Sequence, residues 1–364
     1  MKILLVAGAR PNFMKIAPIV GQLRRQPDRF TAVICHTGQH YDAAMSEIFF
    51  RQLGIPEPDI DLNVGSGSHA QQTAAVIARF EPVVLDARPD LVMVVGDVNS
   101  TVACALVASK LGIAVAHVEA GLRSFDRTMP EEINRVLTDQ ISDLLFITER
   151  TAEENLAREG IARAKVHFVG NVMIDTLLAH RDRAVAAFDA SRNGLDPHGY
   201  ALLTLHRPSN VDRADDFERL MQGIARVAGD LPVFFPVHPR TRPAVARSPI
   251  ASGLVERGRL VLADPLGYLE FLGLMNAAAV VLTDSGGIQE ETTVLGVPCL
   301  TLRENTERPV TVEQGTNQLV GTSPERIAAG WERVRSGGRR GGVPEFWDGH
   351  AAERIASVLQ TTCS

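Results

Sequence analysis

The stretch VVLTDSGGIQEETTVLGVPCLTL, residues 280–302, decides the fold of this chain. Both of its ends are short apolar runs, and between them Ser285 and two glycines open a segment that we interpret as a helix. A continuous apolar strand followed by a helix and a second apolar strand is typical of a parallel β-sheet covered by helices. The stretch therefore predicts one strand–helix–strand unit.

The same alternation runs along the rest of the chain. Longer helix-like segments separate the other short apolar runs, KILLVA, TAVICH, LVMVVG, IAVAHV, DLLFIT, VHFVG, ALLTL and VFFPV. This pattern indicates an α/β protein with parallel sheets covered on both faces. A chain of 364 residues with 45% hydrophobic content suits two domains. A helical stretch ending in Gly and Pro turn signals begins near Val172, so we expect domains at 1–172 and 173–345 and a last helix within 346–364.

The composition excludes several classes of protein. The net charge of -6 comes without a dense Lys/Arg run, which argues against a nucleic-acid partner. Arg10 interrupts the first apolar run, which we interpret as a strand and not a signal peptide, and no run approaches the roughly 18 residues of a membrane helix. Four scattered cysteines without a CxxC pair predict thiols in a reducing cytoplasm, not disulfides or a zinc site.

Polar residues collect where the predicted strands end. They are Arg10, Thr37, Gln39, His40, Asp97, Glu119, His206, His238, Asp284 and Ser285. The carboxyl ends of parallel strands lie along one edge of a sheet, where ligands bind. Any one of these residues is explained as a helix cap, but their joint presence favours a ligand site in each domain, the two sets facing each other across a cleft.

The glycines after Ser285 suit a phosphate or diphosphate, because bare backbone at a helix start lets N–H groups approach an anion. A capped helix start remains the alternative. Glu291, in the same helix, is either an acceptor for ribose hydroxyls or an ordinary acidic residue of the first turns. The run GSGSHA imitates a dinucleotide fingerprint but follows no clear first strand, and no HExxH occurs, so we expect neither a cofactor nor a metal.

An ordered series of motifs resembles the non-hydrolysing UDP-N-acetylglucosamine 2-epimerase family. The motifs are GARPNFMKIAP, TGQHYD, GDVNST, HVEAGLRSFDRTMPEEINR, TLHRP, PVHPR and LTDSGGIQEETTVLGVPCLTLRENTERPVTVEQGTNQLVG. The resemblance covers nearly the whole chain. It implies a glycosyltransferase-B-like architecture, two Rossmann-like domains facing a cleft, with the last helix returning to the first domain and a homodimer as the usual assembly.

The resemblance also implies a set of site residues. The catalytic group is Asp97, Glu119, Glu131 and His206. The residues that match substrate-binding positions are Arg10, Lys15, Arg135, Leu266, Phe271, Ser285, Gly286, Gly287, Glu291 and Arg308. Leu266 departs from the family, since some members carry Gln there. Some members also have a second, regulatory nucleotide-sugar site near the positions of Gln39 and His40, but GSGSH lacks the Arg that accompanies it.

The chemistry explains why carboxylates stand near a diphosphate. Like charges 4 Å apart cost about 4 kcal/mol at an effective dielectric constant of 20, so these side chains are useful only if they move protons. The hydrogen at C2 of the sugar becomes acidic once the C1–O bond to UDP stretches. We expect Glu119 and Glu131 to serve the two faces of C2, in an order that the sequence leaves open, while Asp97 orients them. His206 either helps the leaving phosphate or contacts the sugar.

Other readings stay open at this point. The same chemistry on a modified UDP-acetamido sugar, a glycosyltransferase of similar architecture and a hydrolysing relative all fit a UDP-sugar site. A catalytically silent sensor also fits, although the presence of both Glu119 and Glu131 argues against it.

Overall fold

The computed structural model describes the chain except for residues 9, 39–52, 55–56, 189–193, 339–340 and 363–364. The chain forms two compact units, Met1–Ala179 with Glu345–Ser364, and His180–Pro344. The sequence placed the domain boundary at Val172, the first residue of α7 (Val172–Ala187); the division between the units lies farther along this helix. No helix among the described residues combines the length and apolarity that crossing a membrane requires.

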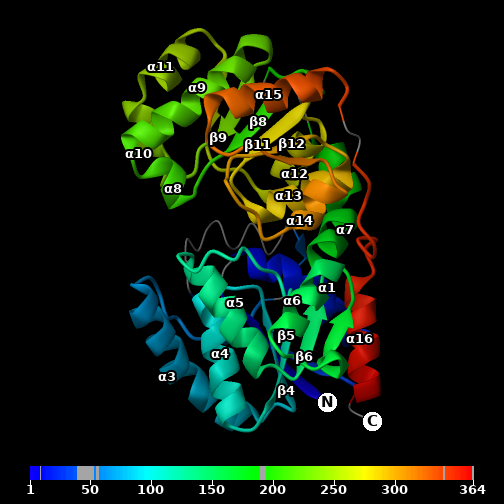
Figure 1. Cartoon of the computed structure of the whole chain (residues 1–364). Coiled ribbons are helices and arrows are strands. Elements are labelled where there is room, and N and C mark those ends of the chain that lie inside the picture. The colour runs from blue at the N-terminus through cyan, green and yellow to red at the C-terminus, as the bar shows by residue number, and fades with distance from the viewer. Residues whose placement is uncertain (9, 39–52, 55–56, 189–193, 339–340, 363–364) are drawn as a thin grey trace. The chain divides into compact units, whose positions relative to one another are not determined.

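The first unit is built on a parallel sheet that has seven strands among the described residues (Figure 1). In spatial order they are β3 (Ile60–Asp61), β2 (Thr31–His36), β1 (Lys2–Ala7), β4 (Leu91–Val95), β5 (Ala114–Val118), β6 (Leu144–Ile147) and β7 (Val166–Phe168). The helices besides α7 are α1 (Arg10–Arg24), α3 (His69–Ala87), α4 (Asn99–Lys110), α5 (Pro130–Ile141), α6 (Arg150–Arg158) and α16 (Ala351–Thr362), with a 3-10 turn at Arg163–Lys165.

Successive side chains of each strand point to opposite faces of the sheet, and the apolar ones form the core of this unit. Leu4 and Val6 of β1 pack with Val76 and Phe80 of α3, while α1 lies against β1 through other residues. Helices α3, α4 and α5 lie side by side (Figure 1). The sheet is therefore an internal layer, which explains why its central strands read as continuous apolar runs.

The end of the chain is part of the first unit. Helix α16 packs beside α1, and the carboxylate of Asp175 on α7 accepts hydrogen bonds from the first amides of α16, Ala351 N at 3.1 Å and Ala352 N at 2.7 Å. The buried Trp347 donates its indole N–H to the carbonyl of Thr148 over 2.9 Å. These contacts fix the last helix on the unit that begins the chain.

The second unit repeats the plan with a parallel sheet of six strands in the part of the chain that is described. Their order is β10 (Leu260–Ala263), β9 (Val233–Pro236), β8 (Ala201–Thr204), β11 (Val280–Thr283), β12 (Cys299–Thr301) and β13 (Asn317–Leu319). The helices are α8 (Pro208–Val211), α9 (Ala214–Asp230), α10 (Arg242–Arg247), α11 (Pro249–Glu256), α12 (Tyr268–Asn276), α13 (Gly286–Leu295), α14 (Pro309–Glu313) and α15 (Pro324–Arg335). Helices α9 and α15 lie together and bury Phe217, Ile224 and Trp331 against the sheet (Figure 1).

Candidate functional site

Both sheets have a topological switch point, where the strand order reverses. It lies between β1 and β4 in the first unit and between β8 and β11 in the second. Ligands of doubly wound sheets bind outside the carboxyl ends of the strands at such a point. The predicted residues stand there, since Asp97 and Glu119 follow β4 and β5, and His206 and Ser285 follow β8 and β11.

Glu119 occupies a strained position at the end of β5. Its backbone has a φ of +69°, in the left-handed region that non-glycine residues enter at a cost of about 1–3 kcal/mol. The conformation is held because the amides of Glu119 and Ala120 both donate to the carbonyl of Phe146 over 3.1 Å. The side chain is buried, and Lys15 Nζ lies 2.6 Å from its Oε2. Lys15, predicted as a substrate residue, therefore contacts the predicted acid/base directly.

Gly96 leaves room for this ion pair. Its φ is +70°, and a Cβ atom there would lie 3.3 Å from Lys15 Nζ and 3.5 Å from Asn12 Nδ2. Both the backbone conformation and the space favour glycine at the end of β4.

Arg135 joins two carboxylates in the same unit. Its guanidinium forms ion pairs with Asp97 and, over 2.5 Å, with Glu132 Oε2. Glu132 also accepts the amides of Ser124 and Phe125 at 2.9 Å, so it stabilises the loop before α5. Its neighbour Glu131 is half-buried in the first turn of α5, and among the described residues none donates a hydrogen bond to its carboxylate. The structure thus brings Asp97 and Arg135 together and leaves the Glu131 carboxylate available to a ligand.

A second network lies beneath these residues. His117 on β5 donates from Nδ1 to Asp139 Oδ1 over 2.6 Å, and its Nε2 lies 2.8 Å from the carbonyl oxygen of Gly96. The other carboxylate oxygen of Asp139 accepts the amide of Gly121 at 3.1 Å and pairs with Arg123 at 2.7 Å. Burial acts to raise the pKa of Asp139, but the charges and hydrogen bonds of His117 and Arg123 outweigh it and hold the pKa below its ordinary value.

In the second unit, His206 is paired with a buried carboxylate. Its Nδ1 lies 2.9 Å from Asp284 Oδ1, and 44% of its side chain is exposed. The ring of His238 lies with its centroid 6.1 Å from that of His206. The predicted His206 is therefore oriented by the residue that directly precedes Ser285.

The start of α13 has the features of an anion site. Ser285 is its N-cap, with no hydrogen bond from the side chain to the helix in the described structure, and Gly286 and Gly287 form the first turn, where backbone amides favour a negative charge. A Cβ atom on Gly286 would come within 2.9 Å of Arg308 Nη1. Arg308 is itself held by Glu290 at 2.6 Å and Glu307 at 2.7 Å. The glycine thus lets a fixed guanidinium approach the helix start.

Glu291, farther along α13, is buried, and the neighbouring Glu290 carboxylate acts on it. The hydroxyl of Tyr268 donates to its Oε1 over 3.1 Å. Burial raises the pKa of Glu291 to about 8, although the hydrogen bond from Tyr268 acts in the opposite direction. Phe271 lies on α12 and Leu266 in the segment before it, both half-buried. The side chain of Arg10, and Gln39 and His40 of the predicted regulatory site, lie outside the described residues.

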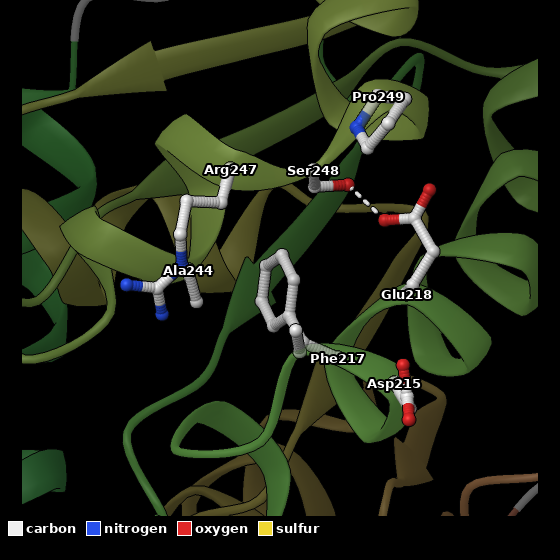
Figure 2. Close-up of a pocket in the computed structure, with 8 residues that line it drawn as sticks. Asp215, Phe217, Glu218, Ala244, Arg247, Ser248 and Pro249 are labelled. Carbon is white, nitrogen blue, oxygen red and sulfur yellow. Dashed lines mark hydrogen bonds between the residues drawn. The ribbon is translucent and has the colours of Figure 1, made fainter.

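A hollow of about 190 Å³ elsewhere in the second unit has a different character (Figure 2). Glu218 lies at its wall and accepts the hydroxyl of Ser248 at 2.5 Å and the amide of Ile250 at 3.2 Å, at the start of α11. Its carboxylate therefore stabilises a helix start. Within the described part of the chain, no group of three His, Cys, Asp or Glu residues is placed to hold a metal ion.

Comparison with known proteins identifies the family. A family model described as UDP-N-acetylglucosamine 2-epimerase matches residues 22–360. The UDP-N-acetylglucosamine 2-epimerase of Methanocaldococcus jannaschii is 44% identical to this chain over 99% of both proteins. The chain belongs to the UDP-N-acetylglucosamine 2-epimerase family.

Two further relatives extend the comparison. A UDP-2,3-diacetamido-2,3-dideoxy-D-glucuronate 2-epimerase of Pseudomonas aeruginosa is 42% identical over 99% of both chains. The crystal structure of the M. jannaschii UDP-GlcNAc 2-epimerase in complex with UDP-GlcNAc and UDP has a TM-score of 0.90, with 99% of this chain and 100% of that one covered.

Membership in the 2-epimerase family confirms the resemblance read from the sequence and places the chain among isomerases. It also confirms the predicted class of two Rossmann-like parallel sheets, of glycosyltransferase-B-like type. The cleft between the two domains stays a prediction. Sequence reasoning missed the contacts of Tyr268, Asp139 and the Lys15–Glu119 pair. It included Asp284 among the strand-end residues without giving it a role.

Proposed function

We propose that this chain interconverts UDP-N-acetylglucosamine and UDP-N-acetylmannosamine by eliminating UDP to a glycal and adding it back at the opposite configuration of C2. The second unit holds the UDP part, with the start of α13 and Arg308 on the diphosphate. The first unit supplies the carboxylates that exchange the C2 proton. The names of the relatives support the substrate, and the chemistry follows from the residues.

Glu119 carries the proposal. A buried carboxylate on strained backbone beside a lysine is costly to maintain, and such strain is typical of functional positions. We assign Glu119 and Glu131 to proton transfer at the two faces of C2. Asp97, held by Arg135, orients them. Lys15 keeps the Glu119 carboxylate in place, and Leu266, Phe271 and Glu291 are assigned to the nucleoside.

Elimination needs stabilisation of the charge that develops on departing UDP. Amides at a helix start and fixed guanidinium groups stabilise such charge most strongly when they are already oriented. Arg308 meets this condition because Glu290 and Glu307 hold it, and Arg10 is assigned to the same phosphates. The electron pair of the C1–O bond leaves with UDP, while a carboxylate removes the C2 proton.

Turnover in heavy water tests the proposal. We expect UDP-N-acetylglucosamine to gain one deuterium at C2 and to reach a mixture with its 2-epimer, without net release of UDP. An epimerised product without deuterium contradicts the elimination, and stoichiometric UDP release indicates a hydrolysing enzyme. An absolute need for an acceptor indicates a glycosyltransferase, and conversion of a UDP-diacetamido uronic acid in preference to the plain sugar indicates the modified substrate.

Two variants test the residues. Glu119→Gln and Glu131→Gln should each lower kcat by about 10²- to 10⁴-fold and leave the Kd for UDP within about threefold, since general acid–base groups contribute this much. Glu154→Gln, on the exposed side of α6, is the matched control and should keep wild-type activity. Near-normal kcat in both site variants contradicts the assignment.

The assembly and location belong to the same proposal. We infer a homodimer from family resemblance, to be tested by light scattering, where about twice the chain mass of 39.4 kDa is expected. We infer work in the cytoplasm, which agrees with the three described cysteines being buried and free of disulfides. A single-chain mass at micromolar concentration contradicts the dimer.

A further inference from the structure

Asp284 is the meeting point of the strand ends in the second unit. It is fully buried after β11 and accepts four donors. Its Oδ1 faces His206 Nδ1 at 2.9 Å. Its Oδ2 accepts the amides of His206 at 3.1 Å and Arg207 at 2.9 Å, and Asn210 Nδ2 at 3.1 Å; the His206 amide also lies 3.2 Å from Oδ1. Asn210 also donates to the carbonyl of Leu302 after β12. The carboxylate therefore links the ends of β8, β11 and β12.

The contacts fix which nitrogen of His206 carries hydrogen. Burial acts to raise the pKa of Asp284, but the hydrogen bonds and charge of His206 and the backbone amides hold it below its ordinary value. An ionised carboxylate only accepts hydrogen bonds, so His206 Nδ1 must carry a proton. The opposite nitrogen, Nε2, receives no hydrogen bond from any described residue, and the side chain is 44% exposed.

The same residue connects the histidine to the anion site. Asp284 directly precedes Ser285, the N-cap of α13, and the amide of Ser285 donates to Thr283 Oγ1 over 3.0 Å. Thr283 Oγ1 in turn lies 2.7 Å from Thr204 Oγ1 on β8, two residues before His206. The His206 ring and the start of α13 are thus both positioned by the two neighbouring strands β8 and β11.

We propose that Asp284 is a positioning residue of the epimerisation: it holds the His206 ring with Nδ1–H on its carboxylate and Nε2 toward the diphosphate. This inference rests on the proposed function. In the UDP-sugar complex the His206 ring carries a proton on both nitrogens, and its charge lies between Asp284 and the diphosphate. As the C1–O bond breaks, its electron pair passes to the phosphate oxygen of UDP, and Nε2 donates its proton to that oxygen. When the bond re-forms, Nε2 takes the proton back, so the cycle consumes no co-reactant.

The variant Asp284→Asn separates this role from a merely structural one. The amide oxygen can replace Oδ2, which accepts three donors, so the amide N–H group is turned to His206 Nδ1. Nδ1 must then accept a hydrogen bond, and the ring proton moves to Nε2. The pocket keeps its shape while the tautomer is reversed and the stabilising charge beside the ring is lost.

We expect kcat of Asp284→Asn to fall by about 10²- to 10⁴-fold, as when the orienting aspartate of a serine protease triad is replaced by Asn. The Kd for UDP should change less than about threefold, and the ¹⁵N shifts of His206, measured on the free protein at a pH where the ring is neutral, should report an Nε2–H ring in place of Nδ1–H. Glu218→Gln, which replaces another hydrogen-bonded carboxylate of this unit, the acceptor of the Ser248 hydroxyl (Figure 2), should keep kcat within about twofold.

The outcomes are distinguishable. Near-normal kcat in Asp284→Asn, or an unchanged His206 tautomer, overturns this inference while the proposed function stands. Loss of kcat together with an equal loss of UDP binding assigns Asp284 a structural role and also overturns it. A wild-type protein that folds and binds UDP but epimerises no UDP-sugar overturns the proposed function instead. The other titratable neighbours, His238 and Arg207, are unchanged in every arm of the experiment.

Discussion

An aspartate–histidine pair in each unit, His117–Asp139 and His206–Asp284, lies near the carboxyl end of the sheet, and these two pairs differ in the use of the second ring nitrogen. His117 is fully buried, and both of its nitrogens meet acceptors, Asp139 and the carbonyl of Gly96. The His206 ring pairs with Asp284 through Nδ1, lies 6.1 Å from the His238 ring between centroids, and is partly exposed. The same pair of residue types, histidine and aspartate, therefore serves two purposes.

The difference shows how a fold uses one interaction for rigidity and for reactivity. Asp139 also holds Gly121 and Arg123, so the segment around the strained Glu119 is tied to one buried carboxylate. Asp284 likewise gathers backbone amides, but it leaves a ring nitrogen facing outward. A histidine whose two ring nitrogens are both hydrogen-bonded within the protein can hold a site in shape. A histidine must have one ring nitrogen open to the substrate in order to exchange protons with it.

The largest effect on stability should follow from breaking the buried pair. Asp139→Asn leaves Arg123 and His117 with a neutral partner in the interior, and we expect a loss of about 3–5 kcal/mol in the free energy of unfolding. The pKa of Asp139 is lowered in the folded state, so its contribution is present above the unfolded pKa of about 3.9 and is lost as the pH falls through the folded value. Urea denaturation at pH 7 and below pH 4 should show the difference shrinking in acid.

The control for this measurement is Asp86→Asn, at an exposed position on α3, which should change the free energy of unfolding by less than about 0.5 kcal/mol. A loss below about 1 kcal/mol for Asp139→Asn would show that the first pair is not a structural element.

Replacing the two histidines should have opposite consequences. His206→Asn should lower kcat by about 10²-fold or more and lower the free energy of unfolding by only about 1 kcal/mol, because the buried Asp284 carboxylate keeps its other three donors. His117→Asn should cost about 2–3 kcal/mol of stability, because two buried acceptors lose their donors. Steady-state kinetics and urea denaturation of the same preparations measure both quantities. If the two variants lose activity and stability in the same proportion, the distinction between the pairs is wrong.

Per pH unit, the smallest effect concerns Glu291, a buried carboxyl with which no described cation forms an ion pair. Burial raises the pKa of Glu291 to about 8, the opposite direction to the two aspartates. Because the pKa of Glu291 is higher in the folded state than in the unfolded state, its contribution to the free energy of unfolding is fully present below the unfolded-state pKa. This contribution is lost as the pH rises toward 8, with a slope of at most about 1.4 kcal/mol per pH unit.

The variant Glu291→Gln cannot titrate at this position. From pH 5 to pH 8 the wild type should therefore lose stability relative to the variant. Urea denaturation at each pH measures the difference in free energy of unfolding. A difference that is constant over this range contradicts the raised pKa.

The sequence predicted the strands that a buried sheet requires. Runs such as KILLVA and TAVICH are β1 and β2, residue for residue. The strands it missed, β3, β10 and β13, all lie at sheet edges. An edge strand needs less apolar surface, and these are short or only partly buried, so their sequences lack the continuous apolar pattern.

The site was predictable in part for a similar reason. Residue types at strand ends could be read from the sequence, because parallel topology brings them to one edge. Their partners could not, since Lys15 lies 104 residues from Glu119 and Asp284 lies 78 residues from the backbone amide of His206. Such pairs depend on the register of the strands and on backbone conformation, as at Glu119, which periodicity does not reveal.

The return of the last helix to the first unit has a consequence for how the protein is made. Helix α16 covers one face of α1, and its first amides donate to the Asp175 carboxylate. Both sites stay without this helix while the ribosome adds His180–Pro344. At about 5–20 residues per second, that interval lasts about 10–30 s. The domain that begins synthesis is thus among the last to be completed, and a truncated product exposes an apolar helix face to chaperones and proteases.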